Sequence, residues 1–157
     1  MTKQRKEPGS RSWILVGMDF SRPAQQALIQ ARSLARERDA ALLVLHVIDG
    51  HGIGELARLA EMPERALRDR LGRERRLRLA EALGATDAGE ADVAIEPVIA
   101  WGRPFEEILK KAVEISATLI VLGTAGHSAD LEKVLFGSTA EKVLRSAPCP
   151  VLCVPVE

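Results

Sequence analysis

The chain has 157 residues, a length that predicts one domain with its own hydrophobic core. Hydrophobic residues make up 46%, which excludes a wholly disordered chain, while aromatic residues make up only 3%, which argues against a base-stacking surface for single-stranded nucleic acid. The 22 basic and 22 acidic residues cancel, so no net charge draws the protein to nucleic acid or to an anionic membrane.

The chain opens with a polar, basic stretch, Met1 to Arg11, that no apolar segment follows. We expect a disordered tail there rather than a secretory signal, and one domain over residues 12–157. No apolar run reaches the about 20 residues needed to cross a bilayer. Cys149 and Cys153 have a C-x-x-x-C spacing that fits neither a thioredoxin-like motif nor half of a zinc ribbon. Buried free thiols are expected, as in the reducing cytoplasm.

Apolar runs alternate with helical patterns along the chain. The first run, Trp13–Gly17, predicts a strand covered on both faces, and Ser21 with Pro23 predicts a helix start directly after it. The other predicted strands are Ala40–Ile48, Val93–Ile99, Leu119–Leu122 and Val151–Val156.

Three further helical segments connect these strands. The segment of about Glu55–Leu83 is charged, and Pro63 predicts either a kink or a fresh helix start near its beginning. Between residues 58 and 81 it carries eight arginines and five acidic residues, which is typical of a solvated helix with intrahelical ion pairs. The other helices are predicted after Gly102-Arg103-Pro104 and over Thr139–Ser146.

This alternation predicts an α/β fold with a doubly wound, five-stranded parallel sheet in the order 3-2-1-4-5 and helices on both faces. Pro97 places the third strand at an edge of the sheet. In this order the winding reverses between the first and fourth strands, and ligands bind beyond the carboxyl ends of the strands at that point. Asp19 follows the first strand and Gly123 ends the fourth, so both are predicted to border one crevice.

A glycine-rich pattern follows the fourth strand: Gly123 and Gly126, ten further residues, then Gly137-Ser138-Thr139. The glycines permit close approach of backbone to a ligand, and the start of the next helix, with two hydroxyls, favours a phosphate. The alternative is that the glycines shape a turn and Ser138 caps a helix. The pattern by itself leaves both interpretations open.

Other motifs do not indicate catalysis or metal binding. Gly137-Ser138-Thr139 lacks the lysine of a phosphate-binding Walker loop, and the glycines at 50, 52 and 54 lack dinucleotide-binding spacing. The three histidines have no metal-ligand spacing. His46 lies within a strand and is expected to be a hydrogen-bonded core residue. Trp101 is expected to cover a hydrophobic edge rather than to stack on adenine.

The pattern as a whole resembles the universal stress protein family over nearly all of Trp13 to Val156. The resemblance is carried by Ile14–Ser21, Leu45–Asp49, Gly102–Pro104, Leu119–Thr124, Gly137–Leu144 and Ala147–Leu152. Each segment alone is weak evidence, whereas their order and spacing together are specific. The resemblance implies a single domain with the adenine nucleotide alpha hydrolase-like fold.

The ATP-binding branch of that family carries the pattern G-x2-G-x9-G-[ST]. By this resemblance Asp19 contacts the adenosine portion, the backbone of Val47 meets the adenine edge, and His127 either contacts phosphate or is solvated. The ribose and phosphates are then held by Gly123, Gly126, Gly137, Ser138 and Thr139. Here ten residues, 127–136, separate the second and third glycines, so the relative placement of the two ends of the loop is open.

The resemblance implies a cytoplasmic regulator of the stress response that binds ATP, or AMP or ADP in its place, together with magnesium. The apolar last strand at a sheet edge predicts a homodimer formed through residues 151–156, and the resemblance supports it. The balanced charge predicts no nucleic-acid or membrane partner, and the lack of a positioned base and of a Walker lysine predicts no enzyme activity. Two alternatives stay open. One is a slow ATPase or self-phosphorylating protein with Ser138 or Thr139 as acceptor, and the other is a nucleotide-free dimeric interaction protein, which the ten-residue spacer favours.

Overall fold

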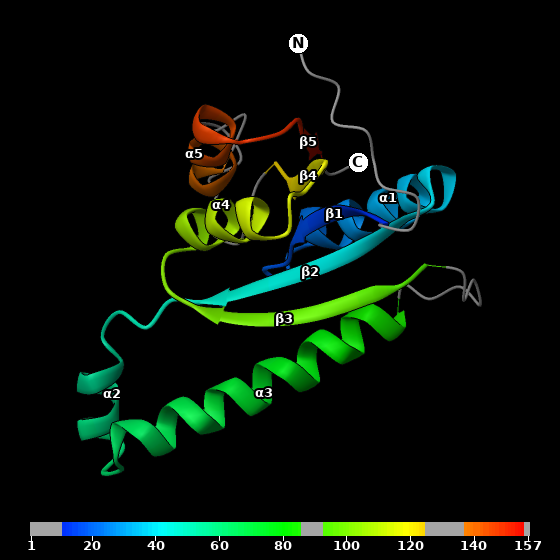
Figure 1. Ribbon diagram of the computed structural model, residues 1–157. Coiled ribbons are helices and arrows are strands. Elements are labelled where there is room, and N and C mark those ends of the chain that lie inside the picture. Colours follow the sequence, from blue (N-terminus) through cyan, green and yellow to red (C-terminus); the bar gives the residue numbers. More distant parts are fainter. Residues whose placement is uncertain (1–10, 86–92, 125–136, 156–157) are drawn as a thin grey trace.

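A computed structural model describes residues 11–85, 93–124 and 137–155 (Figure 1). Residues 1–10 of the tail expected over Met1 to Arg11, and Gly126 and His127 of the glycine-rich loop, lie outside the described residues. The elements, in chain order, are β1 (Ser12–Gly17), α1 (Arg22–Arg38), β2 (Ala40–Ile48), α2 (Ile53–Leu59), α3 (Glu64–Ala85), β3 (Ile95–Trp101), α4 (Pro104–Glu114), β4 (Leu119–Gly123), α5 (Ser138–Ser146) and β5 (Val151–Val154).

The strands form one parallel sheet in the order β3-β2-β1-β4-β5, which confirms the predicted topology (Figure 1). Side chains of α1 and α3 pack in the hydrophobic cluster on one face, and side chains of α4 and α5 pack in the cluster on the other. The sheet is therefore covered on both faces, and β3 and β5 are its edges.

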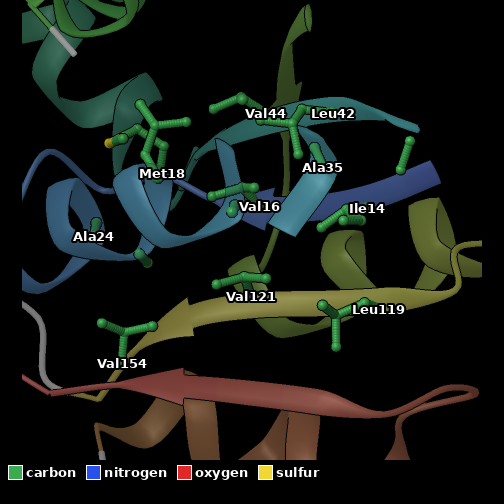
Figure 2. Packing of buried hydrophobic residues seen from close by; sticks show 14 of the residues in the cluster. Ile14, Val16, Met18, Ala24, Ala35, Leu42, Val44, Leu119, Val121 and Val154 are labelled. Carbon is green, nitrogen blue, oxygen red and sulfur yellow. The ribbon is translucent and has the colours of Figure 1, made fainter. Parts of the chain in front are cut away.

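The central strands are apolar on both faces because both faces are buried. In β2, Leu42 and Val44 belong to the cluster beneath α1, whereas Leu43 and Leu45 belong to the cluster beneath α4 and α5. Figure 2 shows the first of these clusters, in which residues of β1 lie between Leu42 and Val44 on one side and residues of β4 on the other. Burying each such side chain contributes about 1.5–3 kcal/mol.

Helix α1 begins where the sequence predicts. Ser21 is its N-cap, and the Ser21 hydroxyl accepts a hydrogen bond from the Ala24 amide at 3.3 Å, with Pro23 in the first turn. The helix ends at Arg38, and its C-cap, Asp39, adopts a left-handed conformation with a φ of 48°. Strand β2 begins at the next residue, Ala40, so the connection from α1 to β2 is a single residue.

The charged segment after β2 forms two helices, as a fresh start at Pro63 predicts. Helix α2 ends at Leu59, and Glu61 takes a positive φ of 51° in the connection. Proline has no amide proton to donate, but the Pro63 carbonyl accepts from the Leu67 amide at 3.1 Å and so opens α3. The charged region is thus a helical hairpin rather than one kinked helix.

Several predicted boundaries were wrong. Strand β3 runs over Ile95–Trp101 instead of Val93–Ile99, because Trp101 still pairs with Ile48 and the turn comes only at Gly102, with a φ of 149°. Strand β5 ends at Val154 rather than Val156, because its partner β4 ends there and Pro155 cannot donate to a ladder. Helix α5 begins one residue earlier than predicted, at Ser138.

Cys149 and Cys153 are free thiols, and both are half-buried rather than buried. They pack against the α4 and α5 cluster beside β5, where the sheet has no further strand to cover them. Burial raises the pKa of both thiols, so the neutral form is favoured. Among the helices of the described part of the chain, none has the length and apolar character that crossing a membrane requires.

Candidate functional site

The loops after β1 and β4 meet at the carboxyl edge of the sheet, where the winding reverses. Gly123 at the end of β4 lies directly against the start of α1. A Cβ atom on Gly123 would lie 2.5 Å from the Pro23 Cβ and 2.8 Å from the Ala24 amide nitrogen. The close approach expected at Gly123 is therefore made to α1, and only glycine allows the two loops to sit this close.

Asp19 is exposed in the turn between β1 and α1. Its Oδ1 atom accepts from the Ser21 amide at 2.9 Å and also from the Ser21 hydroxyl. Its other oxygen, Oδ2, has no hydrogen-bond partner in the described part of the chain. The turn thus fixes the orientation of the carboxylate and leaves one oxygen for a ligand.

Phe20, between Asp19 and Ser21, is buried and has a positive φ of 66°. A bulky side chain takes this conformation only where tertiary contacts hold it. Its ring lies against the His46 imidazole, with 4.5 Å between the ring centroids, and the Arg78 guanidinium of α3 lies 4.4 Å from the ring centroid. Phe20 anchors the Asp19 turn in the core, and the sequence analysis had not singled it out.

His46 supports the same turn from β2. It is 8% exposed, and its Nδ1 atom lies 2.7 Å from the Met18 carbonyl oxygen. A carbonyl can only accept, so the proton is on Nδ1. The Nε2 atom is buried without a partner among the described residues, so the expected hydrogen bonding of His46 is met at one nitrogen only. Burial lowers the pKa of His46, against the opposing effect of the Met18 bond, and favours the neutral ring.

Val47 lies near the end of β2, beyond the end of β1. The ladder between β1 and β2 ends with the pair Gly17–Leu45, after which the Met18 amide donates to the Leu45 carbonyl at 2.9 Å. Backbone groups alternate in direction along a strand, so those of Val47 point the same way as those of Leu45, toward β1. They lie one step past the last residue of β1.

The two described ends of the glycine-rich loop lie side by side. The Gly137 amide donates to the Thr124 carbonyl, and the Thr124 amide donates to the Val154 carbonyl at 3.0 Å. Gly137 is the N-cap of α5 and no side chain caps that helix, so Ser138 is not the capping residue. The exposed Ser138 and half-buried Thr139 therefore stand at a helix N-terminus whose first amides have no intrahelical acceptor.

The structure thus brings six predicted site residues to one edge of the sheet, around the end of β1. Four come from the β4 loop and α5, namely Gly123, Gly137, Ser138 and Thr139, while Asp19 and Val47 come from β1 and β2. Gly126 and His127 lie outside the described residues. The same part of the chain contains no group of three His, Cys, Asp or Glu side chains placed to hold a metal ion.

A second hollow, of about 390 Å³, lies at the ends of β2 and β3 and was not predicted. It is lined by Asp49, Gly50, His51, Arg68, Trp101, Gly102, Arg103 and Glu106. Trp101 packs beside α2 and α3, and the Arg68 guanidinium lies 4.9 Å from the ring centroid. The expectation that Trp101 covers a hydrophobic edge agrees with this contact.

Comparison with known proteins assigns the domain to a family. A family model described as the universal stress protein family matches residues 12–155. A universal stress protein of Thermus aquaticus, encoded in the QAH/OAS sulfhydrylase 3′ region, is 37% identical over 143 residues, covering 90% of this chain and 96% of its own. The chain belongs to the universal stress protein family.

Solved structures agree with this assignment. The structure of the hypothetical protein MJ0577 is similar with a TM-score of 0.77 at 27% identity, covering 93% of this chain and 96% of its own. Universal stress protein UspA from Lactobacillus plantarum has a TM-score of 0.70 at 27% identity, over 92% of this chain and 99% of its own.

Two solved structures of the same fold contain nucleotides. One is a universal stress protein in complex with cAMP, with a TM-score of 0.63 at 24% identity, over 92% of this chain and 97% of its own. The other is the universal stress protein from Archaeoglobus fulgidus in complex with dAMP, with a TM-score of 0.64 at 22% identity, over 92% of this chain and 98% of its own.

Proposed function

We propose that this universal stress protein binds an adenine nucleotide in the crevice between β1 and β4 and acts as a nucleotide-dependent regulator in the stress response. The observation that carries the proposal is a set of polar groups that the fold holds in position and that no other described residue engages. They are Oδ2 of Asp19, the backbone of Val47 and the N-terminus of α5. The cAMP and dAMP complexes of proteins with this fold support an adenine nucleotide as the ligand.

Each of these groups suits a different part of the ligand. The Val47 amide and carbonyl match the donor and acceptor on an adenine edge, and the Asp19 carboxylate accepts from ribose hydroxyls. The amides that open α5, with the helix dipole, favour phosphate. The hydroxyls of Ser138 and Thr139 are oxygen donors of the kind that fits Mg²⁺ bound to phosphates. ATP is the nucleotide we propose, with AMP or ADP as alternatives.

We further propose that the protein is not an enzyme of ordinary speed. The carboxylate in the crevice has one oxygen engaged by Ser21, and Gly137-Ser138-Thr139 lacks a Walker lysine, so no residue that the structure describes is placed as a strong general base or phosphate-polarising cation. Incubation with ATP and magnesium is expected to release phosphate far below about 1 per second. Faster release that Asp19→Ala abolishes would favour the ATPase alternative.

Edge strand β5 is the surface we propose for a homodimer. Leu152 is 37% exposed on this strand, which pairs with β4 on one side only. An antiparallel contact with a second copy would cover the open edge by an isologous interface. Val154 is buried in the core, so Leu152→Lys is the suitable test. Sedimentation should show a dimer for the wild type and a monomer for the variant, and a wild-type monomer at tens of micromolar contradicts the proposal.

Two experiments test nucleotide binding. Acid extraction of the purified protein, followed by chromatography of the supernatant, shows whether an adenine nucleotide copurifies. Titration calorimetry of the stripped protein with ATP and magnesium, then with ADP, AMP and GTP, is expected to show binding of the adenine nucleotides and much weaker binding of GTP. No copurified nucleotide together with no heat at millimolar ligand would favour the nucleotide-free interaction protein. We place the function in the cytoplasm, where thiols such as Cys149 and Cys153 stay reduced.

A further inference from the structure

The turn that presents Asp19 is supported by side chains that lie in the core and do not themselves reach the crevice. The imidazole of His46 donates to the Met18 carbonyl at 2.7 Å, one residue before Asp19. The same ring lies against Phe20, one residue after Asp19, with 4.5 Å between centroids. His46 thus contacts both chain neighbours of the residue expected to bind ribose.

The conformation held in this way is one that the turn would not adopt unaided. Phe20 has a φ of 66°, a left-handed conformation that bulky residues rarely adopt. Gln25 of α1 also donates to the Phe20 carbonyl at 3.3 Å, but it holds only the backbone of that residue. The side chain of Phe20 is held between His46 and Arg78, whose guanidinium is 4.4 Å from the ring centroid.

We propose that His46 is a positioning residue for the nucleotide: through its Nδ1–H bond to Met18 and its ring contact with Phe20, it holds the Asp19 carboxylate in the orientation that binds ribose. This inference rests on the proposed function. It also accounts for a buried imidazole in a strand otherwise made of aliphatic residues. An aliphatic side chain could fill the space but could not donate to Met18.

The neutral ring is the form that does this. The charged groups that act on His46 are Arg75 and Arg78 of α3 and Asp19 of the turn. A proton on Nε2 would add a buried N–H without an acceptor among the described residues and a positive charge near two arginines. The Met18 hydrogen bond and the exposed Asp19 carboxylate oppose this, but burial of the ring outweighs them. Protonation therefore works against the folded turn, and nucleotide affinity should fall as the solution becomes acidic.

Two substitutions separate the two contacts of the ring. His46→Asn keeps an N–H donor near the position of Nδ1, loses the ring and cannot titrate. His46→Phe keeps a ring against Phe20 and loses the donor. His51→Asn is the matched control, because His51 is an exposed histidine in the loop after the same strand. ATP affinity is measured for the wild type and the three variants at pH 7.5 and 5.5, with the thermal midpoint of each ligand-free protein recorded alongside.

At pH 7.5 His46→Phe is expected to bind ATP about tenfold more weakly, the effect of one lost buried hydrogen bond, and His51→Asn to match the wild type. Between pH 7.5 and 5.5 the wild type and His51→Asn should lose affinity more steeply than His46→Asn, in which the contribution of His46 is gone and that of every other titrating group is kept. A purely structural histidine would change the thermal midpoint and leave this difference in pH profile at zero.

The outcomes separate this inference from the function on which it rests. If the wild type binds no adenine nucleotide, both the proposed function and the role of His46 are contradicted. If the wild type binds but His46→Phe has an affinity within twofold of it, only the role of His46 is contradicted. The same conclusion follows if the pH profile of His46→Asn overlays that of the wild type. If His46→Phe does not fold, the pH profile of His46→Asn decides the question by itself.

Discussion

Two places on the carboxyl edge of this sheet could take a small ligand, and they differ in how their polar groups are used. At the β2–β3 hollow, Arg68 pairs with Glu64 at 2.9 Å and Arg103 approaches Glu106 at 3.4 Å. Trp101 is covered by the Arg68 guanidinium. In the crevice between β1 and β4, by contrast, one oxygen of Asp19 and the first amides of α5 have no such partners in the described part of the chain.

The difference shows that a hollow in the surface does not by itself indicate a binding site. A ligand gains affinity from groups that are already oriented and that gain a partner only when the ligand binds. A ligand that binds charged groups already paired at the surface must first separate those pairs, and the exposed pairs that it forms in their place add little affinity. The crevice between β1 and β4 is therefore the better candidate.

The largest effect is expected for alanine at Gly123. The added Cβ would lie 2.6 Å from the Pro23 carbonyl carbon and 2.8 Å from the Ala24 amide nitrogen, both backbone atoms that cannot move aside cheaply. Gly123→Ala should lower the free energy of unfolding by about 1–3 kcal/mol and abolish nucleotide binding. Gly50→Ala is the control in the other hollow, where the nearest atoms are side chains at 3.5 Å. Urea unfolding and calorimetry measure both, and equal effects of the two substitutions would contradict the comparison.

The next effect is expected at Asp19, which has a close counterpart in the other hollow. Asp19 accepts from the Ser21 amide and Asp49 from the His51 amide, both at 2.9 Å, so the two carboxylates cap similar turns. Asp19→Asn should weaken nucleotide binding by about 10- to 100-fold, as expected for a lost charged hydrogen bond, and Asp49→Asn should leave it within twofold. Similar losses for the two variants in the same titration would show that the crevice is not the site.

A smaller effect concerns stability and pH. The pKa of His46 in the folded protein is lowered from 6.5, so the unfolded chain binds the proton first. The stability that neutral His46 contributes is complete above about pH 6.5 and is lost as the pH falls through the folded-state pKa, at up to about 1.4 kcal/mol per pH unit. Urea unfolding between pH 7.5 and 5 should show this decline, and His46→Asn should flatten it. If the free energy of unfolding falls with equal slope in both proteins, the pH dependence arises from groups other than His46.

The smallest effect is expected at Arg68, in the β2–β3 hollow. Its ion pair with Glu64 is at the surface and its contact with Trp101 is a cation–π interaction, each worth about 1 kcal/mol or less. Arg68→Ala should lower the thermal midpoint slightly and leave ATP affinity within twofold. A tenfold loss of ATP affinity would mean that the two hollows form one site.

Local patterns were enough to predict most of the fold. Residues of β2 are buried on both faces, so its bounds, Ala40–Ile48, matched the apolar run. The end of β3 was misplaced because it depends on pairing of Trp101 with Ile48, a contact 53 residues apart that no local pattern carries. Edge strand β5 was overextended for the same reason, since the end of β4 determines where it stops.

The candidate site divides in the same way. The positions of Asp19 and Gly123 at strand ends could be predicted because strand ends follow from the apolar runs and the sheet order. The left-handed conformation of Phe20 and the support from His46 could not, because they arise from contacts among β1, β2 and α3. One sequence signal did point to the support from His46: the alternation of side chains along β2 puts His46 on the same face as Leu42 and Val44.

A crystal structure of the protein with bound ADP would test the central claim most directly. The account predicts the purine beside the backbone of Val47, the ribose within hydrogen-bond distance of Asp19 and the phosphates at the N-terminus of α5. Well-ordered nucleotide in the hollow beside Trp101, with the crevice between β1 and β4 left empty, would contradict it.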